Sequence, residues 1–222
     1  MSETVESREH LLNLARDRAL RGNIYKDLAI AGISVPRHDF SGATFDRVTL
    51  TAGDLRAADL SRATFRQTDL RQALLDGALL DHTSLQNCDL TETDFTKAHF
   101  EDSEIFEVSL MNVCLIEARL ISTRFTRSNL AKARFQGAVL IKCSFSFDER
   151  SPESMMRAQL VNATLIDCDL SKVNLIGADL RGTLFLKCNL GGAQLARAAV
   201  EGTRFIACNT VGADLPDELS KR

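Results

Sequence analysis

The chain has 222 residues, of which 45% are hydrophobic, and its 27 basic and 30 acidic side chains give a net charge of −3. This near balance exerts no general attraction on nucleic acid or an anionic membrane, so we expect neither as a direct partner. The first residues lack the basic segment and apolar run of a secretion signal, and no apolar run reaches the length of a membrane span. We therefore expect a cytoplasmic protein.

Residues 1–37 are expected to form a lead-in to the main domain, and they contain one amphipathic segment. A helix is predicted from Ser7, which can act as its N-cap, to about residue 21. Leu11, Leu12, Ala15 and Ala19 form its apolar stripe. We expect this helix to cover the exposed end of the following domain, and a helix that binds a partner is the alternative.

Residues 38–215 repeat with a period of five. Every fifth residue from Phe40 to Phe145 is Leu, Ile or Phe, and the series resumes at Leu160 and runs to Leu215. We call these the central residues. Neither the 3.6-residue period of an α-helix nor the two-residue period of a strand produces this pattern.

Other positions of the five-residue unit have their own preferences. The residue two places before the central one is small, as in Ala58, and the residue directly before it is often Asp or Asn, as in Asp59. Glycine gathers two places after it, as in Gly42, where a chain that turns a corner benefits from relaxed backbone limits.

The tripeptides Ala58–Leu60, Ala178–Leu180 and Ala213–Leu215 read Ala-Asp-Leu, and the chain thereby resembles the pentapeptide-repeat family. The resemblance implies an all-β solenoid, a right-handed quadrilateral β-helix with four units per coil, closed by the short N-terminal helical cap. Residues twenty apart should then stack, as Phe45 would on Phe65. Coils about 4.8 Å apart give about nine coils and a rod of roughly 40 Å.

The repeat is interrupted at residues 146–155. Arg150 falls on a central position and Asp148 and Glu153 on small inward positions, where no charge can be buried unpaired. We expect a surface loop that omits either one unit or two from the coil. A functional loop and a plain insertion are both open; the candidate loop residues are Phe147, Asp148, Glu149, Arg150, Pro152 and Glu153.

No catalytic, cofactor or metal site is predicted. The aspartates recur as a feature of the repeat on a convex surface, and the four histidines share no ligand-like spacing. Cys88, Cys143, Cys168, Cys188 and Cys208 occupy the small inward position, where a free cysteine packs as a small hydrophobe. Cys114 lies directly before a central residue and is expected to be the most exposed thiol.

Two apolar sets occupy the position after the central residue, which should face solvent. Ile166, Leu186 and Ile206 are twenty residues apart and should stack as an outward stripe, with Ile176 on another side. Phe106, Met111, Ile116 and Ile121 follow four consecutive central residues and should girdle one coil. Contiguous exposed apolar residues usually mark an interaction surface, and partner binding, homodimerisation and a cover from the chain's own helix or loop are the alternatives.

The function expected of such a rod is that of a non-enzymatic bacterial scaffold or adaptor that binds a protein partner. The family resemblance supplies an alternative, a DNA mimic that binds DNA gyrase and protects it from quinolones, and a secretion-system effector or accessory protein is another. Outward positions after the central residues carry more basic than acidic side chains, and the tail at 216–222 is too short and polar for a dimer helix. Both features disfavour the DNA mimic.

Overall fold

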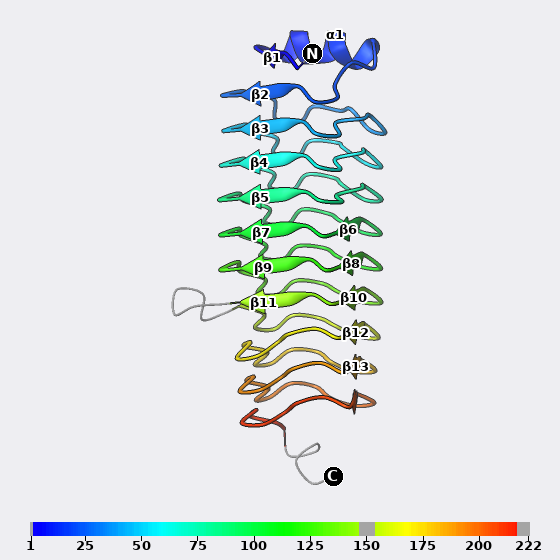
Figure 1. Cartoon of the computed structure of the whole chain (residues 1–222). Helices are drawn as coiled ribbons and strands as arrows, with labels where there is room; N and C mark the ends of the chain where they lie inside the picture. Colours follow the sequence, from blue (N-terminus) through cyan, green and yellow to red (C-terminus); the bar gives the residue numbers. More distant parts are fainter. Residues whose placement is uncertain (1, 147–153, 217–222) are drawn as a thin grey trace.

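The computed structural model describes residues 2–146 and 154–216. These residues form a β-solenoid of about ten turns with parallel strands and one short helix (Figure 1). The elements are β1 (Thr4–Val5), α1 (Arg8–Arg16), β2 (Ile24–Lys26), β3 (Thr44–Asp46), β4 (Thr64–Arg66), β5 (Ser84–Gln86), β6 (His99–Glu101), β7 (Glu104–Phe106), β8 (Arg119–Ile121), β9 (Arg124–Thr126), β10 (Val139–Ile141), β11 (Ser144–Ser146), β12 (Thr164–Ile166), β13 (Leu184–Leu186) and β14 (Arg204–Ile206).

Successive turns stack in register. β3 pairs with β4 so that Phe45 lies opposite Phe65, twenty residues further along the chain. One side of the solenoid is an eight-stranded sheet in the order β1-β2-β3-β4-β5-β7-β9-β11, and a second is a six-stranded sheet in the order β14-β13-β12-β10-β8-β6. The remaining two sides are held by isolated parallel bridges, such as that between Asp54 and Leu74. The predicted four-sided β-helix is confirmed.

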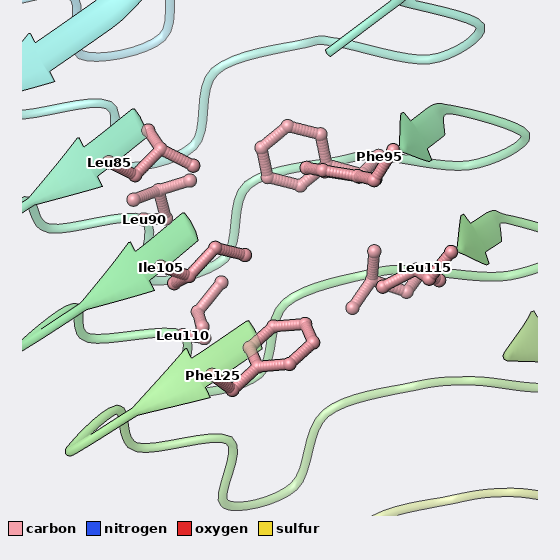
Figure 2. A pocket seen from close by; sticks show the side chains of 9 residues that line it. Leu85, Leu90, Phe95, Ile105, Leu110, Leu115 and Phe125 are labelled. Carbon is pink, nitrogen blue, oxygen red and sulfur yellow. The ribbon is translucent and has the colours of Figure 1, made fainter. Parts of the chain in front are cut away.

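Central side chains fill the interior. Those from Leu85 to Phe125 are at most 2% exposed, and the space between them has no room for a water molecule (Figure 2). The predicted ring stacks are present, with centroids 4.6 Å apart for Phe45 and Phe65 and 4.8 Å apart for Phe185 and Phe205. A column of this width accepts one large side chain per unit and leaves room for only a small side chain beside it.

The small inward residues are satisfied even when they are polar. The Thr93 hydroxyl donates to the carbonyl of Leu70, and that of Thr183 donates to Leu160, both at 2.7 Å. Each bond reaches a central carbonyl in the preceding turn. Because a buried hydroxyl without a partner costs free energy, these bonds explain why Thr, Ser and Cys can replace Ala at this position.

The residue before the central one secures each corner. The side chain of Asp59 accepts a hydrogen bond from the backbone N–H of Ser61 at 2.9 Å, and Asp94 accepts one from Thr96 at 2.9 Å. Such a side chain satisfies a backbone donor that the corner leaves free. The recurring Asp and Asn residues are therefore structural.

The residue two places after the central one has a positive φ. Gly42 has φ of 69°, as the glycine preference predicts, but non-glycine residues hold this conformation in most units, including Lys142 at 54° and Glu92 at 62°. A left-handed conformation costs a residue other than glycine roughly 1–2 kcal/mol. The register between neighbouring turns stabilises the backbone enough to offset that cost at many corners.

The N-terminal helix is a cap. α1 lies across the first turn of the solenoid (Figure 1), with Leu11 and Ala15 buried in the common core. Ser7 is the N-cap, and its Oγ accepts a hydrogen bond from the N–H of His10 at 3.1 Å. The helix ends at Arg16, earlier than predicted, and Ala19 is exposed rather than part of the apolar stripe.

The regular coils begin before residue 38. Leu20, Tyr25, Ile30 and Val35 are buried at five-residue spacing, and Tyr25 stacks on Phe45 with ring centroids 4.7 Å apart. The predicted lead-in to residue 37 was therefore wrong by almost one turn. Its signal was hidden because the inward positions of this turn carry larger side chains, such as Ile33, where later turns carry small ones.

The interruption omits one unit from the register. β10 pairs with β12 so that Leu140 lies opposite Leu165, a separation of 25 residues instead of twenty. Met155 is fully buried, and Leu130 donates its N–H to the carbonyl of Ser154 at 2.7 Å. The predicted loop range 146–155 was thus too wide, because Ser146 ends β11 and Met155 fills a central position. Residues 147–153, with all six candidate loop residues, lie outside the described residues.

Truncating a central residue should be costly. Leu90 is fully buried, so Leu90→Ala should lower the free energy of unfolding by about 2–5 kcal/mol through lost burial and the cavity left behind. Thr91→Ala, next in the chain, should cost less than about 1 kcal/mol, because its partly exposed hydroxyl can exchange its bond for water. Urea unfolding followed by circular dichroism measures both, and equal losses would contradict the assignment of inward and outward positions.

Deleting the five extra residues of the interruption from the chain should preserve the solenoid. Replacement of residues 147–153 by Gly-Ala shortens the chain by five, with glycine two places after Phe145 and alanine two places before Met155. We expect a thermal midpoint within a few degrees of the wild type. The matched replacement Gly-Arg should be strongly destabilised, because it puts an unpaired charge at an inward position. An insoluble Gly-Ala variant would show that the segment itself is structural.

Candidate functional site

The six-stranded sheet carries a continuous outward column of apolar side chains. Strand pairing sets Ile121 opposite Ile141, Ile141 opposite Ile166, and Ile166 opposite Leu186, which lies opposite Ile206. Each of these residues follows a central residue and therefore points away from the interior. Ile206 is 37% exposed, and the other four are partly exposed.

A second column on the same sheet widens this surface. Val139 and Leu184 precede the central residues of β10 and β13, with Thr164 of β12 between them in register. All three side chains are partly exposed. We call the combined surface the apolar face: Ile121, Val139, Ile141, Ile166, Leu184, Leu186 and Ile206.

The stacking of Ile166, Leu186 and Ile206 was predicted from the sequence, and the structure places them in adjacent strands. Ile141, Val139 and Leu184 were missed. The interruption separates Ile141 from Ile166 by 25 residues, so the twenty-residue rule did not connect the two halves of the column. Pairing residues by the position they hold in the unit, rather than by fixed spacing, would have joined them.

Phe106, Met111, Ile116 and Ile121, which were predicted to girdle one coil, lie on four different sides of it. Phe106 ends β7 in the eight-stranded sheet, whereas Ile121 ends β8 in the six-stranded sheet. Met111 and Ile116 lie on the two sides between these sheets, so the four residues occupy the four sides of one coil. Phe106 is 36% exposed, and the guanidinium carbon of Arg127 lies 5.9 Å from its ring centroid. Only Ile121 joins the apolar face.

Ile176 belongs to another side, as predicted. Backbone hydrogen bonds place it directly after Met156 and before Ala196 in a column that starts at Met111 and Ala131. Ala131 is buried, and the others are partly exposed. This column contains two alanines, so two of its side chains are smaller than any in the apolar face.

Charged side chains border the apolar face. Arg119 and Arg204 occupy its two ends in β8 and β14, and Lys142, Asp167 and Lys187 follow its main column at the corner. Among the residues that the structure describes, none of these four cations forms an ion pair, whereas Arg56, Arg71 and Arg181 elsewhere pair with aspartates. The border of the apolar face is therefore mainly basic, with Asp167 and, opposite Ile121 in β6, Glu101 as its acidic members.

A polar cluster lies on the same sheet beyond Ile121. Asp81, His99 and Glu101 each offer one ligand atom within 4.8 Å of the others, and the described residues contain no other such group of His, Cys, Asp and Glu. His99 Nδ1 lies 2.7 Å from Asp81 Oδ1. Imidazole and carboxylate donors suit a divalent transition metal, so these are the residues that could hold one.

Surface hollows in the structure are open and polar. One is lined by Gln67, Thr68, Asp69, Arg71, Asn87 and Asp89, and another by Gln86, Glu104, Ile105, Phe106, Arg124 and Thr126. The carboxylate of Asp69 is bonded to Arg71, which lowers the pKa of that carboxyl. Neither hollow holds a histidine or cysteine.

Four of the cysteines form one inward column. Cys143, Cys168, Cys188 and Cys208 share the small position on one side, since the omitted unit brings Cys143 into line with the other three. Sγ of Cys188 lies 3.4 Å from the carbonyl oxygen of Leu165, as Thr93 and Thr183 also bond to the preceding turn. Cys208 was expected to be protected, but it lies in the last turn and is partly exposed.

Within residues 2–146 and 154–216, the structure contains no helix that is both long and apolar enough to cross a membrane. The cytoplasmic location stays a prediction.

Comparison with known proteins identifies the repeat. A family model described as pentapeptide repeats matches residues 39–77, 73–112, 109–146, 154–192 and 174–209, with eight copies. A search of curated proteins finds no match.

Two solved structures illustrate the similarity. The full-length fluoroquinolone resistance protein QnrB1, which is plasmid-mediated, is 20% identical, with 87% of each chain covered and a TM-score of 0.54. HetL, a pentapeptide repeat protein involved in heterocyst differentiation regulation in the cyanobacterium Nostoc sp. strain PCC 7120, is 21% identical over 96% of this chain and 98% of its own, with a TM-score of 0.46. At these identities the likeness to QnrB1 shows a shared fold.

The thiols should react in two groups. With a thiol reagent under native conditions, Cys114 and Cys208 should be labelled first, because both are partly exposed. Cys88, Cys143, Cys168 and Cys188 should stay protected until unfolding; burial also raises the pKa of Cys88 to about 11, which keeps its thiol protonated. Mass spectrometry of the labelled peptides gives the order, and early labelling of Cys188 would contradict the inward column.

Proposed function

The chain belongs to the pentapeptide-repeat family, and we propose that it is a non-enzymatic scaffold that binds a protein partner through its apolar face. The observation that carries this proposal is the column of five outward apolar side chains in successive strands, from Ile121 to Ile206. Isolated exposed apolar residues are ordinary, but a contiguous set of large aliphatic side chains in successive strands favours an interaction surface.

The way the face is built supports binding rather than chemistry. Its side chains stand on strands whose backbones are paired with both neighbouring turns, except in β14, which ends the sheet. Such a surface is held rigid before a partner arrives, which lowers the entropic cost of association. The two hollows described above lie away from the apolar face, one of them along β7 and β9 of the eight-stranded sheet, and both are open and polar.

A second copy of the chain and DNA gyrase are alternative partners. The apolar face would bury the same residues in a homodimer, so oligomeric state must be measured alongside partner binding. A DNA mimic needs a surface of unpaired acidic groups, but Asp54, Asp69 and Asp179 each pair with an arginine and with a corner N–H. These pairs favour a protein partner that recognises the apolar face.

Changing Ile166, Leu186 and Ile206 together to serine should abolish binding without unfolding the rod. None of the three lies in the interior, and loss of their cross-strand contacts should cost less than about 1 kcal/mol each. The protein with and without the changes is used to capture partners from its native cells, and sedimentation velocity measures self-association. We expect a partner, or a dimer, that the wild type retains and the variant loses.

A matched control makes the same number of changes elsewhere: Leu74→Ser, Ile116→Ser and Ile176→Ser remove exposed apolar side chains from other sides. It should bind as the wild type does. Equal binding by both variants would show that the apolar face is not the interface. Protection of gyrase supercoiling from ciprofloxacin by the wild type and by both variants would instead favour the DNA mimic.

A further inference from the structure

We propose that the partner presents an amphipathic α-helix, which lies along the solenoid axis on the apolar face and has acidic residues beside its apolar stripe. The inference rests on the proposed function and deepens it by naming the chemistry of the partner. It follows from three features of the face, which are its repeat distance, its length and the charge of its border.

The repeat distance fits a helix. The ring centroids of Phe185 in β13 and Phe205 in β14, which belong to neighbouring turns of the solenoid, are 4.8 Å apart. A helix advances about 5.4 Å per turn, so its apolar side chains drift from the strands by about 0.6 Å per turn, or about 2.4 Å over the five strands. An extended chain along the same axis would repeat every ~6.7 Å and lose this match within three strands.

The length of the face excludes α1 as its occupant. Five strands span about 19 Å, which requires a helix of about 13 residues. α1 has nine residues, and its apolar side chains are already buried at the N-terminal end. A second copy docked face to face would set Arg119, Lys142, Lys187 and Arg204 against the same cations of its partner, so the charge of the border favours another protein as the occupant.

The charges around the apolar face favour a partner helix with acidic residues beside its apolar stripe. Arg119, Lys142, Lys187 and Arg204 surround the face, whereas its acidic neighbours are Asp167 and, opposite Ile121 in β6, Glu101; no described residue forms an ion pair with any of the four cations. Cations at the rim of an interface steer and orient a partner of opposite charge. A helix with Asp or Glu on both sides of its apolar stripe meets these cations, whereas a basic helix would be repelled.

The test uses two fluorescent peptides of about 18 residues, long enough to cover the face as a helix. Both carry leucine once per turn, and one has glutamate where the other has lysine beside the leucines. Anisotropy titrations with the full-length protein at low salt measure binding, and circular dichroism measures the helicity of the bound peptide. We expect the acidic peptide to bind at least tenfold more tightly than the basic one and to become helical.

Charge reversal should invert the preference. In the double variant Lys142→Glu with Lys187→Glu, the affinity for the acidic peptide should fall at least tenfold and the affinity for the basic peptide should rise. Glutamate is compatible with this backbone position, as Glu92 shows. The matched control, Lys132→Glu with Lys172→Glu, changes the same corner position on other sides and should leave binding unchanged. The Ile166, Leu186 and Ile206 serine variant should bind neither peptide.

Three outcomes would overturn the proposal: equal affinity for both peptides, no binding of the acidic peptide, or binding without helix formation. Each is distinguishable from failure of the proposed function. If the serine variant loses a natural partner while the acidic peptide does not bind, the face is an interface for a different structure. If neither the partner nor the peptide depends on the face, both proposals fail.

Discussion

Every feature of this solenoid depends on the width of its interior. Beyond the first turn, most five-residue units place one large side chain in a column too narrow for water and one small side chain beside it. A narrower central residue would leave a cavity. The sequence is therefore constrained at two positions of five along about ten turns, and this constraint produces the period that is visible in the sequence.

The remaining three positions serve the backbone and the surface. Asp59 and its equivalents satisfy corner N–H groups, and the corner residues accept a left-handed conformation because the neighbouring turns fix their backbone. What is left to vary is the residue that follows the central one. On the six-stranded sheet that position changes from Glu101 to Ile121 in one turn and stays apolar to Ile206. The packing of the interior does not require apolar residues at these outward positions, so the run is best explained by binding.

The fold was predictable from the sequence because period, inward size and corner chemistry all pointed to the same structure. Three details were not. Large inward residues such as Ile33 hid the first full turn, the interruption fitted one omitted unit as well as two, and the exposure of Cys208 follows from its place in the last turn. Only part of the apolar face could be predicted from the sequence. Ile166, Leu186 and Ile206 share a twenty-residue spacing, but only the pairing of Ile141 with Ile166 in the structure shows that the column continues.

The omitted unit has a geometric consequence. Each unit advances the chain by one side, or a quarter of a revolution, so five residues added to the wound chain would rotate everything downstream by about 90°. Ile166, Leu186 and Ile206 would then emerge on a different side from Ile121 and Ile141, and Cys143 would leave the thiol column. By keeping one unit out of the winding, the chain preserves the angular phase between its two halves. An insertion in such a rod therefore rotates the downstream turns as well as lengthening the chain. A change that leaves the core intact can in this way still separate the residues of a binding surface.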